Sequence, residues 1–148
     1  TLKARSIIKD DVIMQTGYCT YTPRHCQWKK MLSYDEMTKT VKDARITITH
    51  GGPASFFMPL QWGRIPIVVP RQKKYGEHVN DHQLIFARIV ANRQQNILLV
   101  ENITDLGKYI KQYDEMVKKM PRKLKSNNES FNEAFEILVE DLFHAGRK

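Results

Sequence analysis

One stretch decides the fold: Ile46-Thr-Ile-Thr-His50-Gly-Gly-Pro-Ala-Ser-Phe-Phe57. Its β-branched start alternates like a buried strand, and the segment from Ala54 to Trp62 has the length of a helix. Between them, Gly51 and Gly52 allow the backbone to turn sharply, and the first N–H groups of the following helix gather at that turn. A strand, a glycine turn and a helix in this order predict a binding site for an anion, with phosphate as the expected anion.

The rest of the chain alternates predicted strands with predicted helices. We expect strands at residues 12–15, 28–32, 45–49, 65–69 and 96–100. We expect helices at residues 34–44, 81–93 and 103–117, and the end of a further helix at residues 2–8. Ser33 and Glu36 stand at the two positions of a capping box. Strands that are apolar on both faces and alternate with helices predict an α/β fold, a Rossmann-like, doubly wound parallel sheet.

The loops after the strands are the expected place for a site. In a doubly wound sheet, ligands bind at the carboxyl ends of the strands. The loops at Thr16, Leu32, His50 and Arg71 should therefore meet at one edge. The loop at 71–80 is rich in charged and hydrogen-bonding side chains, and loops of this kind often carry function.

Length and composition predict one domain. A chain of 148 residues that is 41% hydrophobic is long enough for one substantial core. We expect residues 1–120 to form this domain and residues 121–148 to form a basic linker and a C-terminal amphipathic helix. The apolar stripe of that helix would pack on the same domain or on a partner.

The formal net charge of +8 suits phosphates, nucleic acid or an anionic membrane surface as partners. Nucleic acid is the weakest of the three, because the basic residues are not interleaved with aromatic residues in a known binding motif. Cys19 and Cys26 have no second pair to complete a zinc or disulfide framework, so we interpret them as reduced thiols of a cytosolic protein. No apolar run has the length of a membrane span, and no signal peptide is visible.

The order of the motifs carries a resemblance. His-Gly-Gly-Pro-Ala-Ser at 50–55 is followed by Ile-Pro-Ile-Val-Val-Pro-Arg at 65–71 and Tyr-Gly-Glu-His-Val-Asn-Asp-His-Gln at 75–83. This order resembles the C-terminal domain of family 28 glycosyltransferases over about Asp11 to Val117. More narrowly, it is similar to small bacterial capsular and exopolysaccharide glycosyltransferase subunits, akin to the catalytic subunit of the dolichol-pathway N-acetylglucosaminyltransferase. The resemblance implies the donor-binding half of a GT-B enzyme, whose N-terminal strand and its glycine-bearing loop are missing from this sequence.

The resemblance also implies roles for individual residues. The donor diphosphate would be held by His50, Gly51, Gly52, Ala54 and Ser55, in agreement with the anion site predicted from the turn itself. The candidates for the donor sugar and ribose are Arg71, Tyr75, Glu77, His78, Asp81, His82 and Gln83. The candidates for the uracil pocket are Met31, Leu32 and Ser33. Met58 replaces the glutamate that related enzymes use to hold the ribose, so either Glu77 does this or the ribose is held otherwise.

The implied activity is the inverting transfer of a hexose, galactose first, from a UDP-sugar to a lipid-linked acceptor in capsular or exopolysaccharide synthesis. The implied partner is a membrane-anchored acceptor-binding subunit that holds this chain at the inner face of the plasma membrane as a heterodimer. No metal or cofactor is expected: His78 and His82 lack a well-placed third ligand, and the chain has no Asp-X-Asp motif of the metal-dependent enzymes. The catalytic base is not identified. The alternative is a non-catalytic enhancer subunit that docks on a membrane-bound glycosyltransferase.

Overall fold

The computed structural model describes residues 2–120 and 136–137. The predicted basic linker and nearly all of the predicted C-terminal helix, at residues 121–148, therefore lie outside the described residues. Among the described residues, no helix is both long enough and apolar enough to cross a lipid bilayer.

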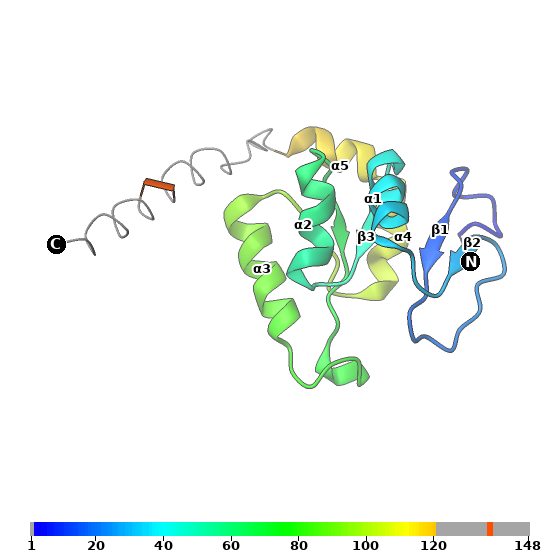
Figure 1. Cartoon of the computed structure of the whole chain (residues 1–148), viewed down its shortest axis with the longest axis horizontal. Helices are drawn as coiled ribbons and strands as arrows, with labels where there is room; N and C mark the ends of the chain where they lie inside the picture. Colours follow the sequence, from blue (N-terminus) through cyan, green and yellow to red (C-terminus); the bar gives the residue numbers. More distant parts are fainter. Residues whose placement is uncertain (1, 121–135, 138–148) are drawn as a thin grey trace.

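The strands are parallel and form two ladders. In the first ladder, β1 (Ile13–Gln15) pairs with β2 (Gln27–Lys29). In the second, β4 (Ile67–Val68) lies between β3 (Ile48–Thr49) and β5 (Leu98–Leu99). Figure 1 shows the first ladder to one side of the domain, beyond α1 (Tyr34–Asp43). The predicted α/β fold with parallel strands is thus confirmed.

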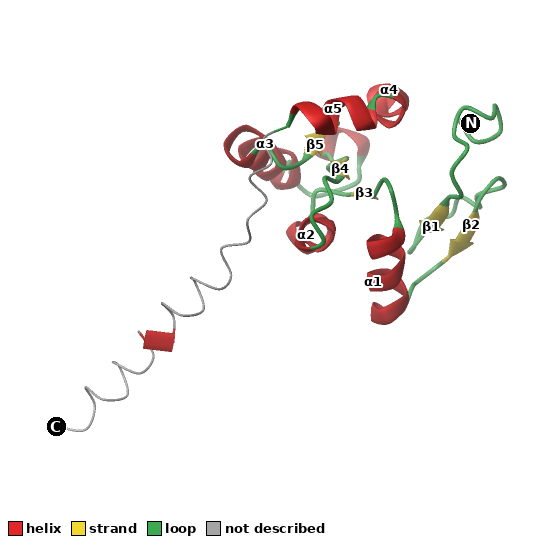
Figure 2. Cartoon of the chain, turned by 90° about the horizontal axis from the view of Figure 1, so that it is seen from above, coloured by secondary structure: helices red, strands yellow, loops and turns green. Residues whose placement is uncertain are grey.

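Helices cover both faces of the three-stranded sheet. The helices after α1 are α2 (Pro53–Gln61), α3 (His82–Gln94), α4 (Leu106–Lys111) and α5 (Tyr113–Lys119). Single 3-10 turns lie at η1 (Lys73–Tyr75) and η2 (Ile103–Asp105). Figure 2 shows α2 on one side of the row of strands and α4 with α5 on the other. This arrangement matches a doubly wound sheet.

Alternation along β4 builds one core on each face. Val68 packs with Phe56 of α2 and Ala87 of α3. Its neighbour Ile67 faces the other way and packs with Tyr113 of α5. Successive side chains of a strand point to opposite faces, so two adjacent apolar residues serve both cores. This is why the predicted strands are apolar on both faces.

The predicted helix starts are confirmed at three places. The Ser33 hydroxyl accepts a hydrogen bond from the Glu36 N–H at 3.3 Å, and the Glu36 carboxylate accepts one from the Ser33 N–H at 2.8 Å. Both halves of the capping box are therefore present. The helices predicted from residues 54 and 81 begin within one residue of those positions.

Three predicted elements differ from the structure. Residues 2–6 form turns instead of the end of a helix, because Ser6 has a left-handed φ of 52° and the segment closes on itself through a hydrogen bond from the Ile7 N–H to the Leu2 carbonyl. The strand predicted at 28–32 is present but shorter, as β2, although the Lys30 carbonyl still accepts a hydrogen bond from the Gly17 N–H at 2.8 Å. Beyond it, the Leu32 N–H donates to the side chain of Gln15.

The long helix predicted at 103–117 is the third error, because it is divided into η2, α4 and α5. The break before α5 places Tyr113 in the core, where its hydroxyl donates to the Ile65 carbonyl at 2.7 Å. A buried phenol needs such a partner, and periodicity in the sequence does not reveal this requirement.

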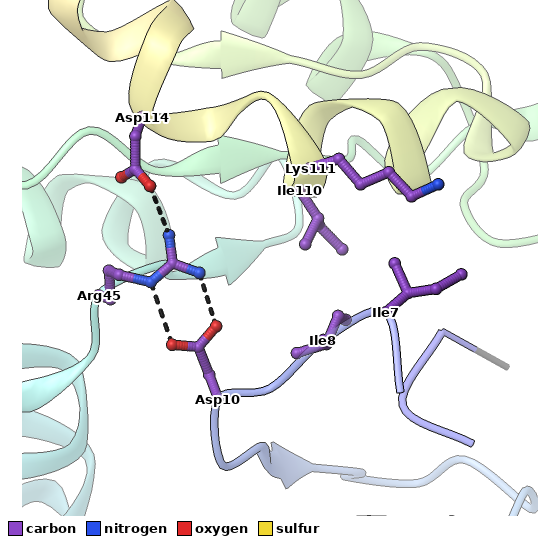
Figure 3. A pocket seen from close by; sticks show the side chains of 7 residues that line it. All are labelled: Ile7, Ile8, Asp10, Arg45, Ile110, Lys111 and Asp114. Carbon is purple, nitrogen blue, oxygen red and sulfur yellow. Dashed lines mark hydrogen bonds and ion pairs between the residues drawn. The ribbon is translucent and has the colours of Figure 1, made fainter. Parts of the chain in front are cut away.

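An arginine joins the two ladders. The Arg45 guanidinium binds the Asp10 carboxylate through two hydrogen bonds of 2.6 and 3.1 Å and the Asp114 carboxylate at 3.1 Å (Figure 3). The hydrogen bond and the charge of Arg45 hold the pKa of Asp10 below its usual value. The three residues line a cavity of about 230 Å³ together with Ile7, Ile8, Ile110 and Lys111.

Two adjacent phenylalanines test the core on the α2 side. Phe56 is fully buried, whereas Phe57 is 44% exposed. We expect Phe56→Ala to lower the free energy of unfolding by about 3–5 kcal/mol, because it removes packing and leaves a cavity. Phe57→Ala should cost much less. Urea denaturation followed by circular dichroism measures both variants, and equal losses would contradict the assignment of Phe56 to the core.

Candidate functional site

The turn between β3 and α2 is built for close packing. A Cβ atom on Gly51 would lie 2.8 Å from the Cβ of Pro70 and 3.0 Å from the Cβ of Gln83. A Cβ atom on Gly52 would lie 2.9 Å from Nδ1 of His50. Gly52 has an ordinary extended φ of −74°, and Gly51 is not among the glycines with positive φ. Lack of space beside Pro70 and Gln83 therefore explains Gly51, whereas a Cβ on Gly52 would meet only the ring of His50.

His50 organises the turn through both ring nitrogens. Its Nδ1 accepts a hydrogen bond from the Gly52 N–H at 2.9 Å, and its Nε2 lies 3.0 Å from the Ser55 hydroxyl oxygen. Because Nδ1 accepts, the proton of the neutral ring is on Nε2, which donates to Ser55. The Ser55 hydroxyl then has its own proton free to donate to another group.

The pKa of His50 favours the same neutral form. Burial of part of the ring lowers this pKa, the nearby positive charge of Arg71 lowers it further, and a hydrogen bond with Gln83 acts in the opposite direction. Burial and the charge of Arg71 thus both disfavour the imidazolium, although His50 as a whole is exposed.

The start of α2 leaves three hydrogen-bond donors without an acceptor among the described residues. The Gly52 N–H is used by His50, the Ser55 N–H donates to the Gly52 carbonyl at 3.0 Å, and the N1 residue is a proline without an N–H. Within the described part of the chain, the N–H groups of Gly51 and Ala54 have no acceptor. Together with the Ser55 hydroxyl, these groups lie at the positive end of the helix dipole. The sequence had assigned a backbone donor role to Gly52 as well, but its N–H is used within the turn.

The loop after β4 meets this turn. Gln83, in the first turn of α3, is only 3% exposed. Its Oε1 accepts from the backbone N–H of Arg71 at 3.3 Å and from the Arg71 side chain at 3.5 Å. Because Gly51 packs directly against Gln83, the structure brings Arg71 and Gln83 to the His50 turn. These two residues and the turn therefore lie together at the carboxyl ends of β3 and β4, where ligands of such sheets usually bind.

A comparison with protein families agrees with this geometry. Residues 2–142 match the model of the glycosyltransferase family 28 C-terminal domain. The chain belongs to this family. It is therefore a glycosyltransferase domain with the fold of the donor-binding half of a GT-B enzyme. No curated protein and no solved structure matches the chain.

The structure places the predicted sugar and ribose candidates at two different locations. Arg71 and Gln83 lie at the His50 turn. Tyr75 and Glu77 instead line a cavity of about 270 Å³, whose other walls are Val69, Pro70, Gln72, Glu101 and Ile103. This cavity lies beside the turn, because Pro70 belongs to its wall and also packs against Gly51.

The remaining candidates, Asp81, His78 and His82, make contacts within the 71–80 loop and at its junction with α3. Asp81 accepts a hydrogen bond from the Lys73 N–H at 2.8 Å through its carboxylate. The rings of His78 and His82 meet edge to face with their centroids 4.5 Å apart, and His82 also bonds to Asn80. Among the described residues, no group of three or more His, Cys, Asp or Glu side chains could hold a metal ion.

The predicted uracil residues lie in the connection between β2 and α1. Met31 is 60% exposed just after β2, while Leu32 and Ser33 connect β2 to α1 through their bonds to Gln15 and Glu36. The structure does not bring these residues into contact with the His50 turn.

Sequence reasoning missed two residues of the cavity. Gln72 is 5% exposed, and its side-chain amide donates to the Glu101 carbonyl at 2.6 Å. The Glu101 carboxylate pairs with Arg88. No motif marks either residue, because the contact joins positions 29 residues apart.

The crowding at Gly51 is testable. Gly51→Ala should lower the free energy of unfolding by about 1–3 kcal/mol, because the methyl group would meet the backbone-anchored Pro70 and Gln83. Gly107→Ala is the matched control. A Cβ atom there meets a Leu2 methyl at an ordinary 3.6 Å, and alanine favours the helix by about 0.5–1 kcal/mol. Thermal or urea denaturation that ranks the two variants equally would contradict the close packing of the turn.

The lowered pKa of His50 makes the stability of the turn depend on pH. Because the folded state favours the neutral ring, its contribution is complete above the ordinary histidine value of 6.5 and is lost as the pH falls below it. The difference in unfolding free energy between wild type and His50→Gln should therefore shrink from pH 7.5 to pH 5. His25→Gln removes an exposed histidine and should show no comparable trend. Urea denaturation across this pH range measures both.

Proposed function

We propose that this domain binds a UDP-sugar through the His50 turn and takes part in inverting transfer of the sugar, with galactose as the first candidate, to a lipid-linked acceptor. The observation that carries the proposal is the set of donors at the start of α2. The N–H groups of Gly51 and Ala54 have no acceptor in the described structure, and the neutral His50 leaves the Ser55 hydroxyl free to donate. A diphosphate is the group that such a surface suits.

In the proposed reaction, the acceptor hydroxyl oxygen attacks the anomeric carbon while the bond from that carbon to the β-phosphate oxygen breaks. UDP leaves with the electron pair of that bond, and the hydroxyl proton passes to a base. The donors of the His50 turn and the dipole of α2 stabilise the negative charge that grows on the leaving UDP. We place the base outside this domain. The domain contributes electrostatic stabilisation and orientation of the donor.

The wider setting is also part of the proposal. The acceptor would be held by a membrane-anchored partner subunit, which would keep this domain at the inner face of the plasma membrane for capsular or exopolysaccharide synthesis. We propose no metal or other cofactor for the transfer. The exposed isoleucines 85 and 89, one turn apart on α3, give a partner an apolar surface to contact.

Calorimetric titration tests the donor site. We expect the chain to bind UDP, and Ser55→Ala to weaken that binding about tenfold, or about 1.4 kcal/mol, because a hydrogen bond to a charged oxygen is lost. Gln61→Ala, at the exposed end of the same helix, is the control and should bind like wild type. UDP-galactose, UDP-glucose and UDP-N-acetylglucosamine then rank the sugars.

An absence of UDP binding by a folded wild-type chain would count against the donor site. Tight binding of such a chain to a glycosyltransferase that is active alone would then favour the enhancer alternative.

A further inference from the structure

Arg71 is an exposed cation at the edge of the His50 turn. Arg71 directly follows Pro70, which packs against Gly51: a Cβ atom on Gly51 would lie 2.8 Å from the Cβ of Pro70. Among the described residues, no carboxylate pairs with the Arg71 guanidinium. Nearby cations are engaged differently: Arg88 pairs with Glu101, and the ammonium of Lys74 lies 4.8 Å from the centre of the Tyr75 ring. The charge of Arg71 is therefore available to a ligand at the turn.

Gln83 restricts the orientation of the Arg71 side chain. Its side chain is 3% exposed, and a buried amide needs hydrogen-bond partners. Two donors of Arg71, its backbone N–H and its Nε–H, share the Oε1 atom of Gln83. Gln83 therefore holds both the backbone and the side chain of Arg71 beside the His50 turn.

The remaining atoms of Arg71 suit a diphosphate. With Nε held by Gln83, both terminal nitrogens of the guanidinium remain free. A planar pair of N–H groups matches two oxygens of a phosphate, which a point charge does not. The turn itself contributes neutral donors only, so a ligand with several negative charges gains from a cation beside them.

We propose that Arg71 is the side-chain cation of the diphosphate site and that Gln83 is a positioning residue that aims it. The inference rests on the proposed function, because it assumes that the anion at the His50 turn is the diphosphate of the donor. It moves Arg71 from the sugar to the phosphate part of the site and gives Gln83 a positioning role toward Arg71.

The first test compares UDP, UMP and UDP-galactose by calorimetry. Arg71→Gln should weaken UDP about ten- to hundredfold and UMP much less, because UMP has one phosphate fewer. Gln83→Met keeps the length of the side chain but removes the acceptor, and it should weaken UDP, which carries no hexose, as well as UDP-galactose. Loss confined to UDP-galactose would identify Gln83 as a sugar ligand and overturn the proposal. Gln94→Met, exposed at the other end of α3, is the matched control.

The second test separates positioning from general damage. If Gln83 acts through Arg71, then Gln83→Met should have little further effect on UDP binding in an Arg71→Gln chain. Additive losses would overturn the positioning role. Circular dichroism confirms that each variant is folded, and Gln83→Glu, which keeps an acceptor for Arg71, should retain more of the UDP to UMP preference than Gln83→Met.

Phosphorus NMR with inorganic pyrophosphate distinguishes failure of this inference from failure of the proposed function. Pyrophosphate binding that depends on Arg71, without binding of UDP, would support the cation site and contradict the UDP donor. UDP binding that is equal in wild type and Arg71→Gln would contradict the cation site alone. Binding of neither ligand would overturn both.

Discussion

The site depends on the close approach of two loops at the carboxyl ends of β3 and β4. Gly51 touches Pro70 and Gln83 so closely that a single methyl group would not fit between them. Adjacent parallel strands hold their ends about 5 Å apart, so only a residue without a side chain lets the connections pack this tightly. Through this contact, the start of α2, the start of α3 and Arg71 share one surface.

Within that surface, His50 decides which groups remain for a ligand. Its ring binds the Gly52 N–H on one side and the Ser55 hydroxyl on the other, so it is a part of the scaffold of the turn. Because Nε2 of His50 donates to the Ser55 oxygen, the hydroxyl proton of Ser55 is free to donate to another group. A histidine that remains neutral does this better than a charged one, since an imidazolium has no acceptor for Gly52. Burial and the charge of Arg71 both favour the neutral ring.

In the proposed function, the help that this turn gives its ligand is mainly electrostatic. Backbone N–H groups, a hydroxyl and a guanidinium are all donors, and donors fixed in advance stabilise charge without reorganising when it develops. The cavity lined by Tyr75 and Glu77 lies next to this turn, and Pro70 both forms part of its wall and packs against Gly51. The polar 71–80 loop thus contributes to two neighbouring surfaces.

The sequence by itself determined the α/β class, most of the order of strands and helices, the capping box at Ser33 and the strand, turn and helix around His50. These features depend on local periodicity and on short motifs, which are properties of neighbouring residues. Only the tertiary structure decided that Gly52 gives its N–H to His50, that Gln83 holds Arg71, and that the buried Tyr113 donates its hydroxyl proton to the Ile65 carbonyl. The hydrogen bond from Gly52 to His50 forms only when the turn that contains both residues has folded. The contact of Gln83 with Arg71 and that of Tyr113 with Ile65 join residues 12 and 48 positions apart, so they exist only after the chain has packed.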